Sequence, residues 1–338
     1  MTIFPTVAAF EAALRDLPHS DPDARENARS RQAELTKPAG SLGRLEDLAI
    51  HIAAWQRTQR PSLDHVRTVI FAGNHGVAAH GVSAFPPSVT AQMVANFEAG
   101  GAAINALCGV AGSELKVVPI ALDQPTADFT QRPAMTALEC LEALEIGAAA
   151  VDPDLHLLTV GEMGIGNTTA AAAICAHLYG GEMRGWTGPG TGLDQAGLTR
   201  KSRVINAALA RHAEAPRTAF ETLRRLGGRE LVAIAGAVLR ARMLSIPVLM
   251  DGFITCAAIA PLAFENAALT AHCIAAHQSA EPGHQRLLAK LNLDPLLRLE
   301  MRLGEGSGAA VAVNLIRSAL AMHNQMATFA EAQVAGQM

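Results

Sequence analysis

Residues 159–178, TVGEMGIGNTTAAAAICAHL, decide the fold: an apolar segment, a glycine-rich turn and an alanine-rich helical segment follow one another without interruption. A short, continuous apolar run is typical of a strand that is buried on both faces of a parallel sheet. The backbone N–H groups of the turn and the start of the helix would form a cradle for an anion such as phosphate. Turn chemistry and helix capping explain the same residues equally well, and the spacing matches neither a Walker A loop nor a GxGxxG motif.

The same alternation of apolar runs and helical segments continues in both directions along the chain. Further apolar runs occupy residues 67–76, 115–122 and 246–255, and the helical segments between them include 88–108 and 228–244. This order predicts an α/β fold with a parallel sheet that is covered by helices on both faces. Ligands of such sheets bind beyond the carboxyl ends of the strands, so the polar residues after each run are the first candidates for a site.

Both ends of the chain are predicted to be helical. Residues 23–35 are charged and lack helix breakers, and residues 41–57 carry one apolar face after a candidate N-cap, Ser41. Residues 307–334 form one last long apolar segment with few charges. We expect this final helix to pack against the N-terminal helices.

The composition argues against several classes of protein. Only 17% of the 338 residues are charged, and the net charge of -4 is made of interspersed acids and bases. Such a surface does not hold a nucleic-acid backbone or an anionic membrane, so neither partner is expected. The N-terminus does not resemble a signal peptide and no apolar run is long enough to span a bilayer, which predicts a soluble, cytoplasmic protein. The low charge favours an oligomer.

The cysteines and histidines do not predict a metal site. The five cysteines are odd in number, widely spaced and without a CxxC pair, so we interpret them as reduced thiols. His75 and His80 follow the first apolar run, but no third ligand stands at a familiar spacing, and hydrogen-bonded structural histidines are the better interpretation. No metal and no cofactor is therefore expected, and no GxSxG signature predicts a nucleophile.

Three loops carry polar residues with more than one possible role. The glycine-rich residues 186–201 end in Lys201, which either pairs with an anion or is an ordinary surface lysine, and the second interpretation is favoured by the sequence alone. In residues 74–93, Phe85 before two prolines could wall a flat ligand, with Gln92 as a polar edge. Residues 277–285 contain two histidines and an acid that could bind a ligand, although an acidic proline turn is the commoner explanation.

Two acids at predicted loop positions complete the candidates. Glu305 stands between glycines in RLGEGSGAA, residues 302–310, where little would shield it from a small ligand. It either lies by the positive end of the following helix, with Ser307 as N-cap, or acts as a catalytic base. Asp251 and Gly252 close the strand IPVLMDG, residues 246–252, and Asp251 either orients the loops or meets a ribose.

Eight motifs together resemble the nicotinate-nucleotide-dimethylbenzimidazole phosphoribosyltransferase family of cobalamin synthesis. They cover the chain from about residue 35 to its end: LTKPAGSLGRLE, FAGNHGV, VTAQMVANF, GEMGIGNTT, GPGTGLD, PVLMDGFI, HQSAEPGH and RLGEGSGAA. The resemblance implies a homodimer with a Rossmann-like parallel sheet in a large domain, residues 63–307, and a small helical domain made of residues 1–62 and 308–338. It implies transfer of the phosphoribosyl group of nicotinate mononucleotide to 5,6-dimethylbenzimidazole, giving alpha-ribazole 5'-phosphate and nicotinate.

The resemblance also assigns site residues. The family's catalytic glutamate falls on Glu305, and its further acidic and basic site residues fall on Glu162 and Lys201. Its phosphate-binding turn and glycine loop fall on Gly164, Gly166, Asn167, Thr168 and Gly190, and its acceptor-base pocket falls on Ser83, Phe85, Gln92, Met163 and Leu303. The alternative is a noncatalytic nucleotide-binding or sensing protein on the same fold, because a fold does not guarantee an activity.

Overall fold

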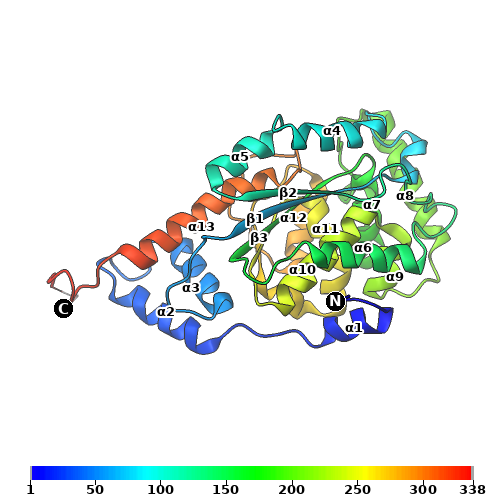
Figure 1. Cartoon of the computed structure of the whole chain (residues 1–338). Helices are drawn as coiled ribbons and strands as arrows, with labels where there is room; N and C mark the ends of the chain where they lie inside the picture. The colour runs from blue at the N-terminus through cyan, green and yellow to red at the C-terminus, as the bar shows by residue number, and fades with distance from the viewer. Residues whose placement is uncertain (1, 336–338) are drawn as a thin grey trace.

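The computed structural model describes residues 2–335 and is built on one parallel sheet of five strands (Figure 1). The strand order is β2-β1-β3-β4-β5. The strands are β1 Val66–Ala72, β2 Glu114–Pro119, β3 Leu157–Met163, β4 Val248–Met250 and β5 Cys273–Ala275. Because the chain passes from β1 to one side and then returns to the other side at β3, the topological switch point lies between β1 and β3, where ligands of such sheets bind.

Helices precede, connect and follow the strands. They are α1 Val7–Arg15, α2 Pro22–Glu34, α3 Arg44–Gln56, α4 Ser88–Glu98, α5 Ala103–Ala111, α6 Ala137–Ala149, α7 Asn167–Tyr179, α8 Gln195–Arg211, α9 Ala219–Leu226, α10 Arg229–Met243, α11 Phe253–Glu265, α12 Pro282–Leu291 and α13 Ser307–Gln325, with short 3-10 turns η1 Gly76–His80, η2 Met183–Gly185 and η3 Ala267–His272. The α/β class with a helix-covered parallel sheet, predicted from the apolar runs, is confirmed.

The two faces of the sheet carry different sets of helices. On β1, Val69 and Phe71 face the main core under α6, α10 and α11, whereas Ile70 faces a smaller cluster under α4 and α5. Helices α6 and α10 cross so closely that a methyl group on Gly147 or Gly236 would collide with the opposite backbone. Glycine at these two positions therefore lets the helices approach closely.

Helices from the two ends of the chain lie side by side. Figure 1 shows α2 and α3 next to α13, away from the sheet's carboxyl edge, and α13 contacts α3 directly. The predicted packing of the last helix against the N-terminal helices is thus confirmed. Helix α1 lies elsewhere: Phe10 joins the main core and its ring packs 6.3 Å from that of Phe220. The division into residues 1–62 with 308–338 and residues 63–307 stays a prediction.

Three predicted helix boundaries were wrong. Residues 88–108 form two helices, because the chain takes a left-handed turn at Gly100 (φ 79°) between α4 and α5. Helix α3 begins after Gly43 (φ 51°) without a side-chain cap, so Ser41 does not cap it. The last helix ends at Gln325, and residues 327–333 form a bridge and turns instead.

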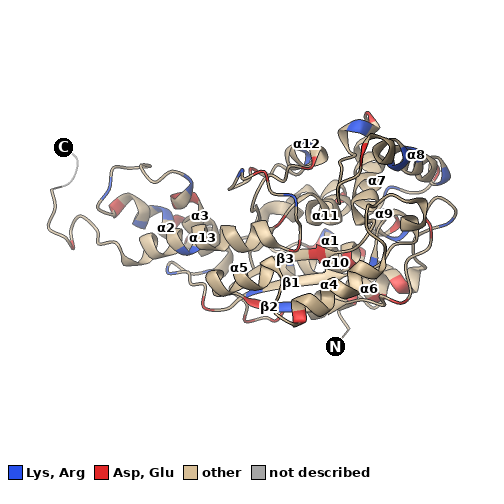
Figure 2. Ribbon diagram, turned by 90° about the horizontal axis from the view of Figure 1, so that it is seen from above, with Lys and Arg blue, Asp and Glu red and all other residues tan. Residues whose placement is uncertain are grey.

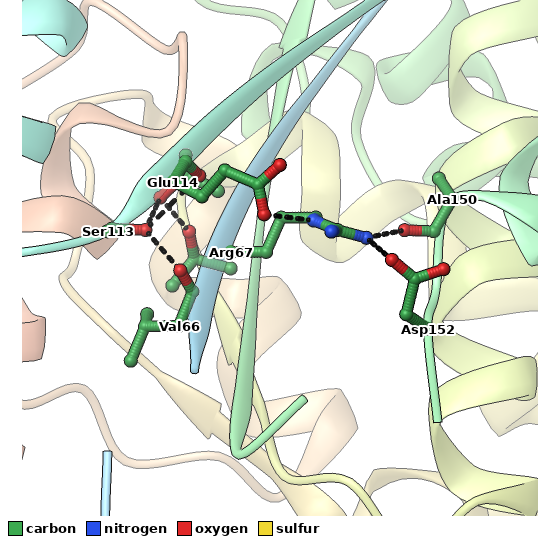
Figure 3. Close-up of polar contacts among 8 residues, drawn as sticks. Val66, Arg67, Ser113, Glu114, Ala150 and Asp152 are labelled. Atoms are coloured by element: carbon green, nitrogen blue, oxygen red, sulfur yellow. Dashed lines mark hydrogen bonds and ion pairs between the residues drawn. The ribbon is translucent and has the colours of Figure 1, made fainter. Parts of the chain in front are cut away.

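Charged residues at the amino edge of the sheet fix the alignment of the first strands. The Arg67 guanidinium on β1 binds Glu114 of β2 at 2.8 Å and Asp152, before β3, at 2.5 Å (Figure 3). The three groups pull β1, β2 and the start of β3 together at the edge opposite the ligand side. Over the rest of the molecule, residues of both signs are spread over the helices with long uncharged stretches between them (Figure 2).

Within residues 2–335 no helix is long and apolar enough to cross a membrane. The five cysteines are all buried and free, as the sequence predicted. No group of three or more histidine, cysteine, aspartate or glutamate side chains in this part of the chain is arranged to hold a metal ion.

Candidate active site

A cavity of about 540 Å³ opens at the carboxyl ends of β3, β4 and β5. This edge is where the topology predicts a ligand, and the volume lies in the range of small-molecule sites. The lining comes from six segments: Phe85; residues 162–168 without Gly166; Gly190 and Thr191; residues 251–255; His277, Ser279 and Glu281; and Arg302, Leu303 and Gly304.

The turn between β3 and α7 brings backbone and polar side chains to the cavity. Gly164, Asn167 and Thr168 line it, and Gly166 (φ 98°) is the N-cap of α7 without a side chain to occupy the first turn. The positive end of the α7 dipole is therefore directed at the cavity wall, where it favours an anionic ligand. Asn167 also donates a very short hydrogen bond to Glu162.

Lys201 lies behind this turn and outside the lining, with 1% of its surface exposed. Its Nζ donates to Thr168 Oγ1 at 2.8 Å and to the Gly188 carbonyl at 3.1 Å. Burial lowers the pKa of Lys201 to about 8, and the Glu281 carboxylate opposes that shift. The interpretation of Lys201 as a surface lysine was wrong. The amine supports the wall of the anion cradle from within the protein.

The loop that carries Glu305 has an unusual backbone. Gly304, Glu305 and Gly306 all adopt left-handed φ values, 82°, 63° and 77°. A left-handed conformation costs a residue with a side chain about 1–2 kcal/mol, which two flanking glycines avoid for themselves. The loop packs on the end of β3, because a Cβ on Gly161 would lie 2.5 Å from the Gly306 nitrogen.

Asp251, at the end of β4, holds this loop and the start of α13. Its carboxylate accepts hydrogen bonds from the Gly306 N–H at 3.2 Å and the Ala309 N–H at 3.0 Å. His277 Nε2 lies 3.5 Å from the same carboxylate. The prediction that Ser307 caps the helix was wrong, because Gly306 is the N-cap and Ser307 Oγ donates to the Gly304 carbonyl at 2.7 Å. Asp251 thus orients a loop, and because it also lines the cavity, its contact with a ribose stays a prediction.

Glu305 is 6% exposed and lies just outside the lining, next to Leu303 and Gly304, which belong to it. Burial, with a smaller effect of the Asp251 charge, raises the pKa of Glu305 to about 7. The sequence could not decide whether burial or the helix N-terminus has the larger effect on this pKa. In the structure, burial has the larger effect. An acid with such a pKa exchanges a proton readily near neutral pH.

Glu162, at the end of β3, is the second buried acid and does line the cavity. Burial raises its pKa to about 8, with further contributions from the charges of Glu230, Asp251 and Glu305 and an opposing hydrogen bond from Asn167. The site therefore has two acids with raised pKa values, Glu162 in the cavity lining and Glu305 just outside it. Such a pair is typical of sites that move protons, although buried structural acids are shifted as well.

The residues predicted for the acceptor base are only partly brought together. Phe85, Met163 and Leu303 line the cavity, and the side chains of Phe85 and Leu303 stay 52% and 57% exposed at its rim. Ser83 reaches the site indirectly, through a 3.0 Å hydrogen bond to Thr191 Oγ1. Gln92 is exposed on α4 and is not part of the lining.

His75 and His80 are hydrogen-bonded side chains, as the sequence predicted. His75 Nε2 lies 2.5 Å from Glu230 Oε1, and His80 Nε2 lies 2.8 Å from Asp128 Oδ2. In residues 277–285, Glu281 accepts from the Gly190 N–H at 3.0 Å and joins two loops of the cavity. The interpretation of this segment as an acidic proline turn agrees with the position of Glu281, which precedes Pro282 and is the N-cap residue of α12.

Comparison with known proteins identifies the family. A family model described as Phosphoribosyltransferase matches residues 17–334. The nicotinate-nucleotide–dimethylbenzimidazole phosphoribosyltransferase of Novosphingobium aromaticivorans is 65% identical over 335 residues, 99% of either chain. That of Ruegeria sp. is 55% identical over 329 residues, 97% of either chain.

The chain belongs to the nicotinate-nucleotide–dimethylbenzimidazole phosphoribosyltransferase family. The crystal structure of CobT from Thermus thermophilus has the same fold, with a TM-score of 0.87 and 39% identity, covering 94% of this chain and 100% of that one. The resemblance read from the eight motifs is confirmed, and the noncatalytic alternative loses its support because the chain is a phosphoribosyltransferase throughout its length.

Several residues of this phosphoribosyltransferase cavity were not singled out from the sequence. Arg302 brings a guanidinium to the lining and donates to the Gly190 carbonyl at 3.2 Å, although it begins the very stretch that drew attention to Glu305. Its position three residues before Glu305 in the sequence was the signal that could have found it. Thr191, Phe253 and Ser279 carry no comparable local signal, because only the fold brings their loops together.

Proposed function

We propose that this protein transfers the phosphoribosyl group of nicotinate mononucleotide to 5,6-dimethylbenzimidazole and releases nicotinate and alpha-ribazole 5'-phosphate for the lower ligand of cobalamin. The names of the relatives supply the acceptor and the nucleotide. One observation carries the proposal: a buried acid with a pKa near neutrality, Glu305, adjoins a cavity that also has an anion-favouring helix start.

The leaving group needs little help from the protein. The pyridinium nitrogen of nicotinate mononucleotide is positively charged, so its bond to C1' breaks with both electrons going to nicotinate. A ring nitrogen of dimethylbenzimidazole forms the new bond to C1' from the opposite face, which converts a beta substrate to an alpha product. The acceptor becomes cationic in this step and must lose its N–H proton.

Glu305 is the base that takes this proton in the proposed reaction. A carboxylate with a pKa of about 7 is ionised in a useful fraction at neutral pH, and general base catalysis contributes about 10²–10⁴-fold. Because the carboxyl group adjoins the lining, it has to turn past Gly304 to meet the acceptor.

The phosphate of the donor is placed at the start of α7. Gly164, Gly166, Asn167 and Thr168 surround that helix start, Gly190 lies beside Thr168, and Lys201 supplies a positive charge through the Thr168 hydroxyl. The flat acceptor lies between Phe85, Met163 and Leu303. Fixing two reactants in this way converts a bimolecular encounter into an oriented one, which is a large source of rate.

A homodimer in the cytoplasm is part of the same proposal. Large apolar side chains stay exposed away from the cavity, on α5, α6, α11 and the 299 region: Val110, Leu138, Phe264 and Leu299. Single exposed apolar residues are common on monomers, so the support for association comes instead from the low share of charged residues, 17%. Free, buried cysteines suit a reducing compartment. Light scattering after gel filtration would measure the mass, and a monomer at micromolar concentration would contradict the dimer.

The activity is tested by incubating the purified protein with nicotinate mononucleotide and dimethylbenzimidazole. We expect nicotinate and alpha-ribazole 5'-phosphate in equal amounts, with the alpha configuration at C1' established by NMR. Product of beta configuration would contradict attack from the opposite face. Absence of both products would contradict the proposed function itself.

A further inference from the structure

Behind the cavity lies a buried acid–histidine pair that the proposed reaction does not use. Glu230, in the first turn of α10, and His75, in the loop after β1, have fully buried side chains, and His75 Nε2 lies 2.5 Å from Glu230 Oε1. A carboxylate withdrawn from water in this way costs free energy unless it is paired. Glu230 is therefore expected to serve a purpose beyond packing.

The backbone around Glu230 leaves room for its carboxylate and little else. A Cβ on Gly73, Gly164 or Gly228 would lie 2.5, 2.9 or 2.7 Å from an oxygen of Glu230. Two of these glycines, Gly73 and Gly164, directly follow β1 and β3, the two strands that flank the switch point. The carboxylate is thus enclosed directly beneath the turn that carries the site.

Gly164 and Asn167 lie between Glu230 and Glu162. The position of a Cβ on Gly164 is 2.9 Å from Glu230 Oε1 and 3.2 Å from Asn167 Nδ2, and Asn167 donates to Glu162 Oε2. The other oxygen, Glu162 Oε1, adjoins Gly304 of the cavity lining. One oxygen of Glu162 is therefore occupied by the Asn167 amide, and the second is left at the cavity.

Three carboxyl groups act on Glu162, and each of them raises its pKa. The ionisable groups that act on it are Glu230, Asp251 and Glu305. Glu230 has His75 at 2.5 Å, and Asp251 has His277 at 3.5 Å together with two backbone N–H groups. Arg229, next to Glu230 in sequence, binds Glu139 and the Gln124 carbonyl.

Glu230 and Asp251 each have a histidine nearby, whereas Glu162 accepts from the Asn167 amide and has a pKa raised to about 8, so Glu162 keeps its proton at neutral pH. We propose that Glu230 is a positioning residue whose charge, anchored by His75 and enclosed by three glycines, keeps Glu162 protonated as a hydrogen-bond donor to an oxygen of the bound nucleotide. This inference rests on the proposed function. It gives the two acids of the site opposite duties: Glu305 accepts a proton from the acceptor, and Glu162 retains one for the donor substrate.

The proposal is tested with Glu230→Gln, Glu162→Gln and the double variant, each assayed for kcat/KM of nicotinate mononucleotide from pH 6 to 10. Wild-type kcat/KM should fall above about pH 8, as Glu162 loses its proton. Glu230→Gln should bring that fall to lower pH by about one unit, which is about tenfold less activity on the alkaline side. Glu162→Gln keeps an N–H donor at every pH and should show no alkaline fall.

The double variant separates positioning from structure. If Glu230 acts through Glu162, adding Glu230→Gln to Glu162→Gln should change kcat/KM less than twofold. A loss in the double variant as large as in Glu230→Gln alone would overturn the proposal, and so would an unchanged alkaline limb in Glu230→Gln. Should Glu230→Gln fail to fold, His75→Gln is the second variant, and it should move the limb in the same direction.

Infrared difference spectroscopy of the ligand-free protein tests the proton on Glu162 without any turnover. The wild type minus Glu162→Gln should show the C=O stretch of a protonated carboxyl group at pH 7, and Glu230→Gln should weaken it. Absence of that band would overturn the inference while leaving the proposed function intact. A protein with the band but without products from nicotinate mononucleotide would contradict the function alone.

Discussion

Asp251→Asn is the perturbation that connects fold and chemistry most closely. The Asp251 carboxylate accepts hydrogen bonds from two N–H groups at the start of α13, at 3.2 and 3.0 Å, and its charge contributes to the raised pKa of Glu305. An asparagine presents one acceptor oxygen where the carboxylate presents two. At least one of these bonds is lost and the helix dipole loses its counter-charge.

The expected magnitudes follow from these contacts. A hydrogen bond to a charged acceptor contributes about 1.5–3 kcal/mol, so the free energy of unfolding should fall by about that amount. For a chain of this size the melting temperature should drop by roughly 3–10 °C. Removing the charge also lowers the pKa of Glu305 from about 7. Because the base form of Glu305 is the active one, the acid limb of kcat/KM should move to lower pH.

The assay combines thermal melting with pH profiles of kcat/KM for dimethylbenzimidazole. Asp21→Asn is the matched control, because Asp21 caps α2 far from the cavity by accepting from the Ala24 N–H at 2.8 Å, and asparagine caps helices well. The control should change the free energy of unfolding by no more than a few tenths of a kcal/mol. It should leave the acid limb of kcat/KM in place. An acid limb that stays in place, or moves to higher pH, in Asp251→Asn would refute the coupling of Asp251 to the base.

Further predictions concern the loops and the buried charges. Gly304→Ala should abolish most activity, since its Cβ would collide with Glu162, whereas Gly100→Ala, with a similar φ of 79° and open space, should be active; equal rates would contradict the tight fit. Lys201→Met should raise KM for nicotinate mononucleotide by about ten- to a hundredfold with little loss in melting temperature, because a buried charge disappears with its hydrogen bond. An unchanged KM would leave Lys201 a structural residue. In urea unfolding, the free energy of unfolding of Glu162→Gln should rise relative to that of wild type between pH 5 and pH 8. In the wild type the unfolded chain releases the Glu162 proton in this range while the folded protein keeps it, which favours unfolding as pH rises. A difference between the two proteins that does not depend on pH would contradict the raised pKa.

The strands and their functional edge were predictable, because a strand buried on both faces must be apolar throughout. The runs predicted at 67–76 and 246–255 and the start of residues 159–178 overlap β1, β4 and β3. Helix boundaries were less predictable, since they depend on backbone turns. A glycine such as Gly100 can lie within a helix or end it. The packing of α4 and α5 on β2 decides that the helix ends here.

The candidate site was predictable where its residues stand next to one another in sequence. Glu305 between two glycines signals a special backbone, and the three left-handed φ values explain that pattern. Contacts between distant segments gave no such signal. Asp251 caps a helix that begins 56 residues later in the chain, and Lys201 is buried only because α8 packs against α7.

The most direct measurement is the rate of alpha-ribazole 5'-phosphate formation in Glu305→Gln, with both substrates saturating at pH 7.5. Glu300→Gln is the matched control, because Glu300 also has a left-handed φ, 56°, but is exposed. We predict that Glu305→Gln is slower than wild type by about 10²–10⁴-fold and that Glu300→Gln is unaffected. A Glu305→Gln rate within a few-fold of wild type would contradict the assignment of Glu305 as the base.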